Sequence, residues 1–100
     1  MKVNIEQQEH EILVSIEGRL DTTHAAEFER AANQIKETPM EKVILDCTQL
    51  SYISSSGLRI FLSLQKAATA KNGLLIIRNM NDTIKEIFDM TGFTKLFIFE

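Results

Sequence analysis

Apolar and polar residues alternate in two segments near the start of the chain. This period of two is typical of strands that bury one face. The short polar segment 8–10 between them suits the turn of a hairpin, and we expect Gly18 to end the second strand. The apolar residues of the two predicted strands are Val3, Ile5, Ile12, Val14 and Ile16.

Three later segments have apolar residues three or four positions apart, which is the spacing along one face of a helix. They lie within 21–39, 57–73 and 81–92. Their apolar residues are Ala25, Phe28, Ala32 and Ile35, then Leu58, Phe61 and Leu62, and finally Ile84, Ile87 and Phe88. The residues expected to start or stop these helices are Asp21 or Thr22, Pro39, Asn72 with Gly73, Asn81 or Asp82, and Gly92.

Three short runs, 43–45, 74–77 and 96–99, are apolar without interruption. The first two are typical of strands buried on both faces, and the third predicts a last strand. The expected order is therefore β-β-α-β-α-β-α-β. Strands that alternate with helices form a mostly parallel sheet. We predict a single α/β domain over 1–100, with a mixed, mostly parallel sheet and helices packed on it.

Composition narrows the possible functions. Apolar residues make up 44% of the chain and charged residues 25%, which is ordinary for a soluble globular protein. A net charge of -3 gives no general attraction to nucleic acid. The N-terminus lacks the apolar segment of a signal peptide, and no apolar run reaches the roughly 20 residues of a membrane span. We expect a cytoplasmic protein with no nucleic-acid partner and no membrane insertion, and by default a monomer when free.

Few residues are suited to a metal or redox site. Cys47 is the only cysteine, so no intrachain disulfide can form, and its place beside an apolar run predicts a small buried side chain. His10 and His24 are isolated in the sequence, so we expect both on the surface and neither as a metal ligand. Phosphate-loop and dinucleotide motifs are absent. No cofactor is therefore expected.

The run Ser54-Ser55-Ser56-Gly57 stands directly before the second predicted helix, and three roles are open for it. One serine can cap the helix, which is worth about 1 kcal/mol relative to alanine. A catalytic serine of the hydrolase type is disfavoured, because Ile53 replaces the first glycine of G-x-S-x-G and both histidines precede the serines. We expect no enzymatic activity.

The third role is a phosphorylation switch. Phosphoserine carries about -1.5 to -2 charges, and a helix N-terminus tolerates that charge because free amides and the helix dipole face it. An apolar or acidic partner surface at the same place would not tolerate it. Ile60 and Leu64 are apolar but lie off the main stripe of the helix, which fits either a docking surface or a helix set deeper in the core.

Four stretches of the chain resemble the STAS-domain family of bacterial anti-sigma factor antagonists. The resemblance extends over essentially all of the sequence, and the order and spacing of the stretches make it specific. The stretches are Gly18-Arg19-Leu20-Asp21, Val43-Ile44-Leu45-Asp46 with Leu50, Tyr52-Ile53-Ser54-Ser55-Ser56-Gly57-Leu58, and Ile87-Phe88-Asp89-Met90-Thr91-Gly92-Phe93.

This resemblance implies a mechanism. Family members bind an anti-sigma factor that is also a serine kinase, and so release a sigma factor for transcription. The kinase uses ATP to phosphorylate one serine at the head of the second helix, which dissociates the two proteins. A separate, metal-dependent serine phosphatase restores the active form. The antagonist itself catalyses nothing.

Carried over by position, the family's D-S-S-G motif falls on 54–57. The resemblance then implies that Ser55 is the phosphoacceptor and that Ser56 lies at or next to the helix cap. Asp21 matches an acidic residue near the phosphoacceptor, which either orients the serine or caps the preceding helix. Gly57 is expected to leave the helix entry open to a partner. The residues expected to contact the partner are Ser54, Ser55, Leu58 and Arg59.

The sequence departs from the family pattern at Ser54, where many phosphorylated members have aspartate. The change removes a negative charge that could assist the kinase, and it makes Ser54 and Ser56 alternative acceptors. Some members continue into a C-terminal helix, which we do not expect here. Two other functions stay open: a non-phosphorylated STAS scaffold subunit of a lipid-transport or signalling complex, and the binding of a nucleotide or other phosphate at the helix start.

Overall fold

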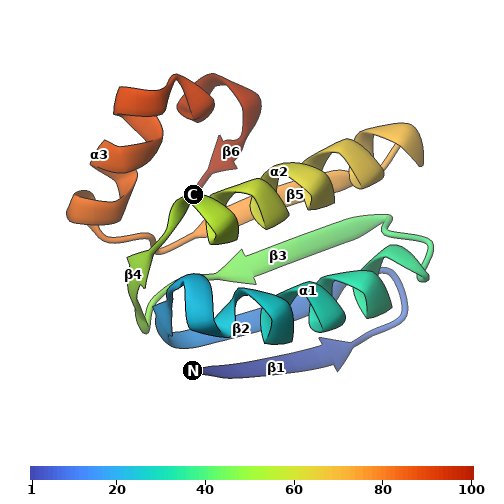
Figure 1. Cartoon of the computed structure of the whole chain (residues 1–100). Coiled ribbons are helices and arrows are strands. Elements are labelled where there is room, and N and C mark those ends of the chain that lie inside the picture. The colour runs from blue at the N-terminus through green and yellow to red at the C-terminus, as the bar shows by residue number, and fades with distance from the viewer.

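The computed structural model describes residues 1–100 and contains six strands, three α-helices and one 3₁₀ helix (Figure 1). The strands form one sheet in the order β1-β2-β3-β5-β6, and β4 pairs with β2 off that path. The strands are β1 (Lys2–Gln7), β2 (Ile12–Leu20), β3 (Lys42–Asp46), β4 (Leu50–Ile53), β5 (Leu74–Arg78) and β6 (Ile98–Phe99). The helices are α1 (Thr22–Lys36), α2 (Ser55–Ala70), α3 (Asp82–Thr91) and the 3₁₀ helix η1 (Phe93–Leu96).

The sheet is mixed and mostly parallel, which confirms the predicted fold class. β1 and β2 form an antiparallel hairpin in which Gln7 pairs with Ile12. β2, β3, β5 and β6 run parallel to one another, and β4 runs parallel to β2. The helices pack on one face of the sheet, with α1 and α2 side by side across it (Figure 1). The domain therefore has two layers, one of helices and one of strands.

The core lies between these two layers, where 23 buried residues form one apolar cluster. Phe61 of α2 links all three α-helices within it. Its ring centroid lies 5.6 Å from that of Phe28 in α1 and 6.0 Å from that of Phe88 in α3. Ile60 and Leu64 belong to the same cluster. The interpretation of α2 as a helix set deep in the core is therefore confirmed, and the use of these two residues for docking is wrong.

Capping side chains explain where the helices start and stop. Asp21, Ser54 and Asn81 cap α1, α2 and α3, each through a side-chain oxygen that accepts a backbone N–H. Gly92 ends α3 in the left-handed conformation, with φ of 78°. The Nδ2 of Asn81 also donates to the carbonyl oxygen of Leu50 at 3.1 Å, which ties the start of α3 to β4.

Three features of the strands differ from the prediction. Residues 50–53 form β4 instead of a loop, because β2 is long enough to pair with β3 along its first part and with β4 along its last part. Accordingly β2 does not end at Gly18, where φ is 94° and the register shifts, but continues to Leu20. The last strand is shorter than 96–99, because the chain forms η1 directly after the turn at Gly92.

The isolated cysteine and histidines have different surroundings. Cys47 is fully buried, as predicted. Its burial, together with a neighbouring carboxylate, raises the pKa of its thiol to about 12. His10 is exposed, with its Nδ1 2.8 Å from a carboxylate oxygen of Glu41. His24 is not the solvated residue that we expected, because it is half-buried and bonded to Asp21.

No helix of the chain combines the length and the apolar character that crossing a bilayer requires.

Truncating Phe61 should destabilise the whole domain. Phe61→Ala removes the ring that joins the three helices, and we expect the free energy of unfolding to fall by about 3–5 kcal/mol. Urea denaturation followed by circular dichroism measures this change. Leu62→Ala, a truncation at the next and only partly buried position, is the control. Equal losses in the two variants would contradict the central position of Phe61.

Candidate functional site

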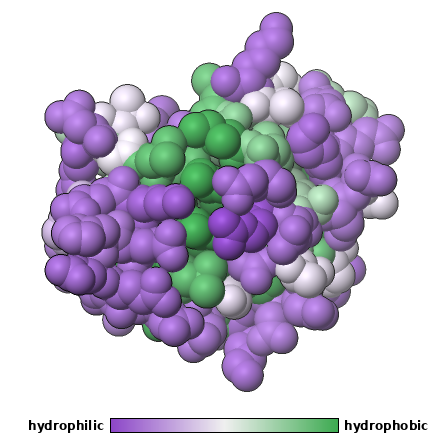
Figure 2. Space-filling model, turned by 180° about the vertical axis from the view of Figure 1, so that it is seen from behind, coloured by the Kyte–Doolittle hydropathy of each residue, from purple (hydrophilic) through white to green (hydrophobic).

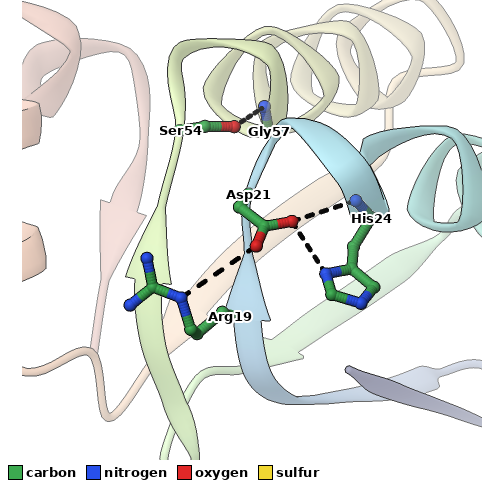
Figure 3. Close-up of polar contacts among 5 residues, drawn as sticks. All are labelled: Arg19, Asp21, His24, Ser54 and Gly57. Atoms are coloured by element: carbon green, nitrogen blue, oxygen red, sulfur yellow. Dashed lines mark hydrogen bonds and ion pairs between the residues drawn. The ribbon is translucent and has the colours of Figure 1, made fainter.

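Two strands that lead into helices end side by side. Leu20, the last residue of β2, is the register partner of Ile53, the last residue of β4. The N–H of Ser54 then donates to the carbonyl oxygen of Leu20 at 2.8 Å. Because β2 and β4 run parallel, α1 and α2 begin next to each other at one edge of the sheet (Figure 3). We call Asp21 together with residues 54–59 the helix-start site.

Ser54 is the N-cap of α2. Its Oγ accepts the N–H of Gly57 at 3.2 Å, and its carbonyl oxygen accepts the N–H of Leu58 at 2.9 Å. The residue is only 8% exposed. The cap is therefore Ser54, and Ser56 lies two residues further along, inside the first turn. Because the Ser54 hydroxyl is engaged and buried, it is a poor alternative acceptor and offers little surface to a partner.

Ser55 and Ser56 carry unused polar groups. Ser55 is exposed and Ser56 is half-buried, and neither hydroxyl has a hydrogen-bond partner within the chain. As the first two residues of α2 they also have backbone N–H groups without a helical acceptor. Two amide donors and the positive end of the helix dipole therefore lie beside the Ser55 hydroxyl. An anionic group on Ser55 would meet donors there.

Gly57 is required by packing within the domain. It is buried, and a Cβ at this position would lie 2.7 Å from Cγ of Leu20 and 3.1 Å from Cγ1 of Ile53. No side chain fits between α2 and the ends of β2 and β4 at this point. This corrects the expected role of Gly57, because the close approach that it permits is made by Leu20 and not by a partner.

The expected partner contacts at Leu58 and Arg59 differ in access. Leu58 belongs to the core cluster and is buried, which corrects the expectation of a direct contact through it. Arg59 is exposed and forms no ion pair within the chain. With Ser56 it lines a groove of about 510 Å³ between α1 and α2. Of the four expected contact residues, Ser55 and Arg59 reach the surface, whereas Ser54 and Leu58 do not.

Asp21 caps the start of α1. Its Oδ1 accepts the backbone N–H of His24 at 3.0 Å and lies 2.7 Å from His24 Nδ1, and its Oδ2 lies 4.0 Å from Nε of Arg19 (Figure 3). Desolvation alone would raise the pKa of the Asp21 carboxyl, but the hydrogen bonds from His24 and the nearby positive charges outweigh it and lower the pKa. The capping role is therefore confirmed. A role in orienting Ser55 stays a prediction, since Asp21 forms no hydrogen bond with the serines.

Sequence reasoning missed a cation–π pair beside this site. Cζ of Arg19 lies 4.4 Å from the centroid of the Tyr52 ring, which belongs to its register partner on β4. Only knowledge of the β2–β4 pairing brings these two residues together, so no local signal in the sequence could have found them. No group of three or more His, Cys, Asp or Glu side chains in the structure is arranged to hold a metal ion.

Comparison with known families identifies the domain. The family model of the STAS domain matches residues 2–100, which is nearly the whole chain. The chain belongs to the STAS domain family. This membership confirms the resemblance found in the sequence motifs.

Several relatives of this STAS domain have been named or solved. The chain is 29% identical to the anti-sigma-B factor antagonist of Staphylococcus epidermidis, over 96% of this chain and 91% of the relative. It is 27% identical to the anti-sigma F factor antagonist of Paenibacillus polymyxa, over 96% of this chain and 85% of that protein. The structure of the anti-sigma factor antagonist SpoIIAA of Bacillus, in its unphosphorylated form, matches with a TM-score of 0.82 and 19% identity over 99% of this chain and 88% of SpoIIAA. The fold of this STAS domain is thus the fold of SpoIIAA.

Removing the cap of α2 should cost stability, whereas removing the next hydroxyl should not. We expect Ser54→Ala to lower the free energy of unfolding by about 1 kcal/mol, because the N–H of Gly57 loses its acceptor. Ser55→Ala, the matched control, should change it by less than about 0.5 kcal/mol. Chemical denaturation of both variants measures the difference. A larger loss for Ser55→Ala would contradict the assignment of the cap.

Proposed function

We propose that this STAS domain is an anti-sigma factor antagonist whose partner is an anti-sigma factor with serine kinase activity. Binding of the domain releases a sigma factor, and phosphorylation of Ser55 ends the binding. The names of the relatives support the antagonist role. The observation that carries the proposal is the Ser55 hydroxyl, which is exposed and free of hydrogen bonds at the N-terminus of α2.

The modification itself is a phosphoryl transfer in which this chain supplies only the nucleophile. The Ser55 Oγ forms a bond to the γ-phosphorus of ATP held by the kinase, the bond to the β–γ bridging oxygen breaks, and ADP leaves. The hydroxyl proton passes to a base on the kinase. A separate serine phosphatase would return the hydroxyl by hydrolysing the phosphate ester.

The geometry supports Ser55 over its neighbours as the acceptor. The Ser54 hydroxyl is buried, and its oxygen already accepts the Gly57 N–H, so a kinase could reach it only if the first turn of α2 moved. Ser56 is half-buried beside the groove between α1 and α2, so it is less accessible than Ser55. Ser55 can take a phosphate without breaking any contact within the domain.

The charge of a phosphate is enough to end a complex without unfolding the domain. Moving a complex from about 99% to about 1% bound takes roughly 5.5 kcal/mol of differential free energy. Within the free domain, the unpaired amides of the first turn and the helix dipole stabilise the charge. In a complex that covers Ser55 with an apolar or acidic surface, the same charge is buried or repelled, and this can cost several kcal/mol.

The modification can be tested on the protein isolated from its native cells. Intact mass with fragment mapping should find a single phosphate, on Ser55. A phosphate on Ser54 or Ser56 would keep the switch but contradict the assigned acceptor. Absence of phosphate from cells sampled throughout growth and stress would contradict the switch and favour a scaffold subunit that is not phosphorylated.

Substitutions of Ser55 should distinguish binding to the kinase from the regulation of that binding by phosphorylation. With each anti-sigma factor kinase of the source organism as the probe, we expect Ser55→Ala to bind in the presence of ATP without dissociating. Ser55→Asp should weaken binding by about tenfold or more, because its charge meets the partner surface. Calorimetry measures both variants.

Ser51→Asp is the matched control, since it adds the same charge at another exposed serine, on β4. An equal loss of affinity in Ser51→Asp and Ser55→Asp would mean that the charge acts over the whole surface, and Ser55 would lose its special role.

A further inference from the structure

Arg59 is a positive charge without a counter-ion in the domain. Arg19 and Arg78 each form an ion pair with a carboxylate, whereas Arg59 is exposed and forms none. It is the fifth residue of α2 and therefore lies about one helical turn beyond Ser55. No contact within the chain restrains its guanidinium, so this group is free to bind an anion that comes within its reach.

The spacing between Ser55 and Arg59 is the one that brings two helical side chains together. Residues four positions apart have Cβ atoms about 5–6 Å apart on the same side of a helix. Helical side chains also lean toward the N-terminus, so Arg59 extends back over the turn that Ser55 begins. An acid four residues before a base is the more favourable order for such a pair. Of the three consecutive serines only Ser55 has a cation at this spacing, because apolar residues stand four positions after the other two.

The groove beside this helix start has an excess of positive charge. Glu29, Lys36 and Arg59 are the charged residues that line it, so the groove has two bases and one acid. None of the three forms an ion pair within the chain. A phosphate on Ser55 would bring about -2 charges to the end of this groove. It would therefore meet a surface that attracts it.

We infer that Arg59 binds the phosphate of phosphorylated Ser55 in the free domain. The inference rests on the function proposed above, because it concerns the phosphorylated state of that site. A guanidinium is a planar fork of N–H donors that matches the oxygens of a phosphate. The free backbone N–H groups at the start of α2 supply further donors. The phosphate is thus held from two directions, by the helix start and by a side chain one turn later.

This pairing gives phosphorylation a second effect on a partner. In the unmodified domain the Arg59 guanidinium is exposed and available to a carboxylate of the partner. In the phosphorylated domain the same guanidinium is occupied by the phosphate. The modification therefore adds negative charge and withdraws a cation from the same surface. Regulation at this site depends on Arg59 as well as on Ser55.

Both effects stay on the helical side of the domain. Figure 2 shows the other side, where the hydrophobic surface forms a band between hydrophilic flanks. The domain extends over 19 Å along its shortest axis, whereas salt largely screens exposed charges from one another beyond about 8 Å at physiological ionic strength. Phosphorylation and the pairing with Arg59 should therefore affect partners at α1 and α2 and leave the far side of the sheet unchanged.

Genetically encoded phosphoserine in place of Ser55 tests the pairing without any kinase. A nearby cation favours the dianion, so we expect Arg59 to lower the pKa of the second ionisation of the phosphate. Titration followed by ³¹P NMR measures it. Arg59→Gln should raise this pKa, and Arg59→Lys should restore part of the decrease, because lysine keeps the charge but not the fork. The other charged groups near the helix start and the groove are the same in every variant and cancel in the comparison: Arg19, Asp21, His24, Glu29 and Lys36.

Lys66→Gln is the matched control for the loss of a positive charge. Lys66 is an exposed cation on the same helix, about three turns beyond Ser55. Its substitution should leave the phosphate titration unchanged. An equal shift in Arg59→Gln and Lys66→Gln, or no shift in Arg59→Gln, would overturn the inference.

Thermal unfolding measures the same pairing as a difference between the phosphorylated and the unmodified domain. We expect Arg59→Gln to lower the Tm of the phosphorylated domain by about 2–4 °C. The Tm of the unmodified domain should fall by less than about 1 °C, because Arg59 has no partner there. Equal changes in the two forms would contradict the pairing.

The failure of this inference is distinguishable from the failure of the proposed function. Because the phosphoserine is encoded, neither measurement depends on a kinase. Absence of phosphate from the native cells would contradict the proposed function, whereas only the comparison of Arg59 variants decides whether Arg59 binds the phosphate.

Discussion

The parallel pairing of β2 with β4 determines the geometry of the helix-start site. This pairing sets Leu20 directly against the first turn of α2, where a Cβ on Gly57 would lie 2.7 Å from the Leu20 side chain. The helix can enter this close only through a glycine at its third position. Once Gly57 is fixed there, Ser54 takes the cap and Ser55 faces outward. A steric contact and a backbone pairing thus set the roles of three chemically identical serines.

Most of the fold could be predicted from the sequence, because its elements have strong periodic patterns and local caps. Asp21, Asn81 and Gly92 bound helices where capping chemistry predicts. β4 could not be predicted, since residues 50–53 form a strand of only four residues with two exposed in the middle. Its existence depends on the unpaired last part of β2, which is a distant segment. Short strands of this kind are defined by their partners and not by their own sequence.

The location of the candidate site could be predicted from the sequence, but the role of each of its residues could not. The serine run before an amphipathic helix indicates the helix start, and the family motif singles out Ser55. Burial then distinguishes the roles of the residues that follow the serines, because Leu58 packs into the core and Gly57 packs against Leu20. Arg19 over Tyr52 was missed for the same reason as β4, since both depend on a pairing across more than thirty residues of chain. The motif alone indicates the function, whereas the accessibility of each residue can be determined only from its packing in the structure.

The two-layer architecture separates the helix-start site from the opposite face of the sheet. Ser55 begins a helix in one layer, whereas Ile44 and Ile76 point away from that layer. A partner that covers the start of α2 therefore leaves the opposite face of the sheet free. The two layers are still in direct contact at this helix, because α2 packs on β5 as well as on β4. Coupling between sites is reciprocal, so any change in the sheet that altered the position of α2 would alter the affinity for that partner, and binding of the partner would favour the same change in the sheet.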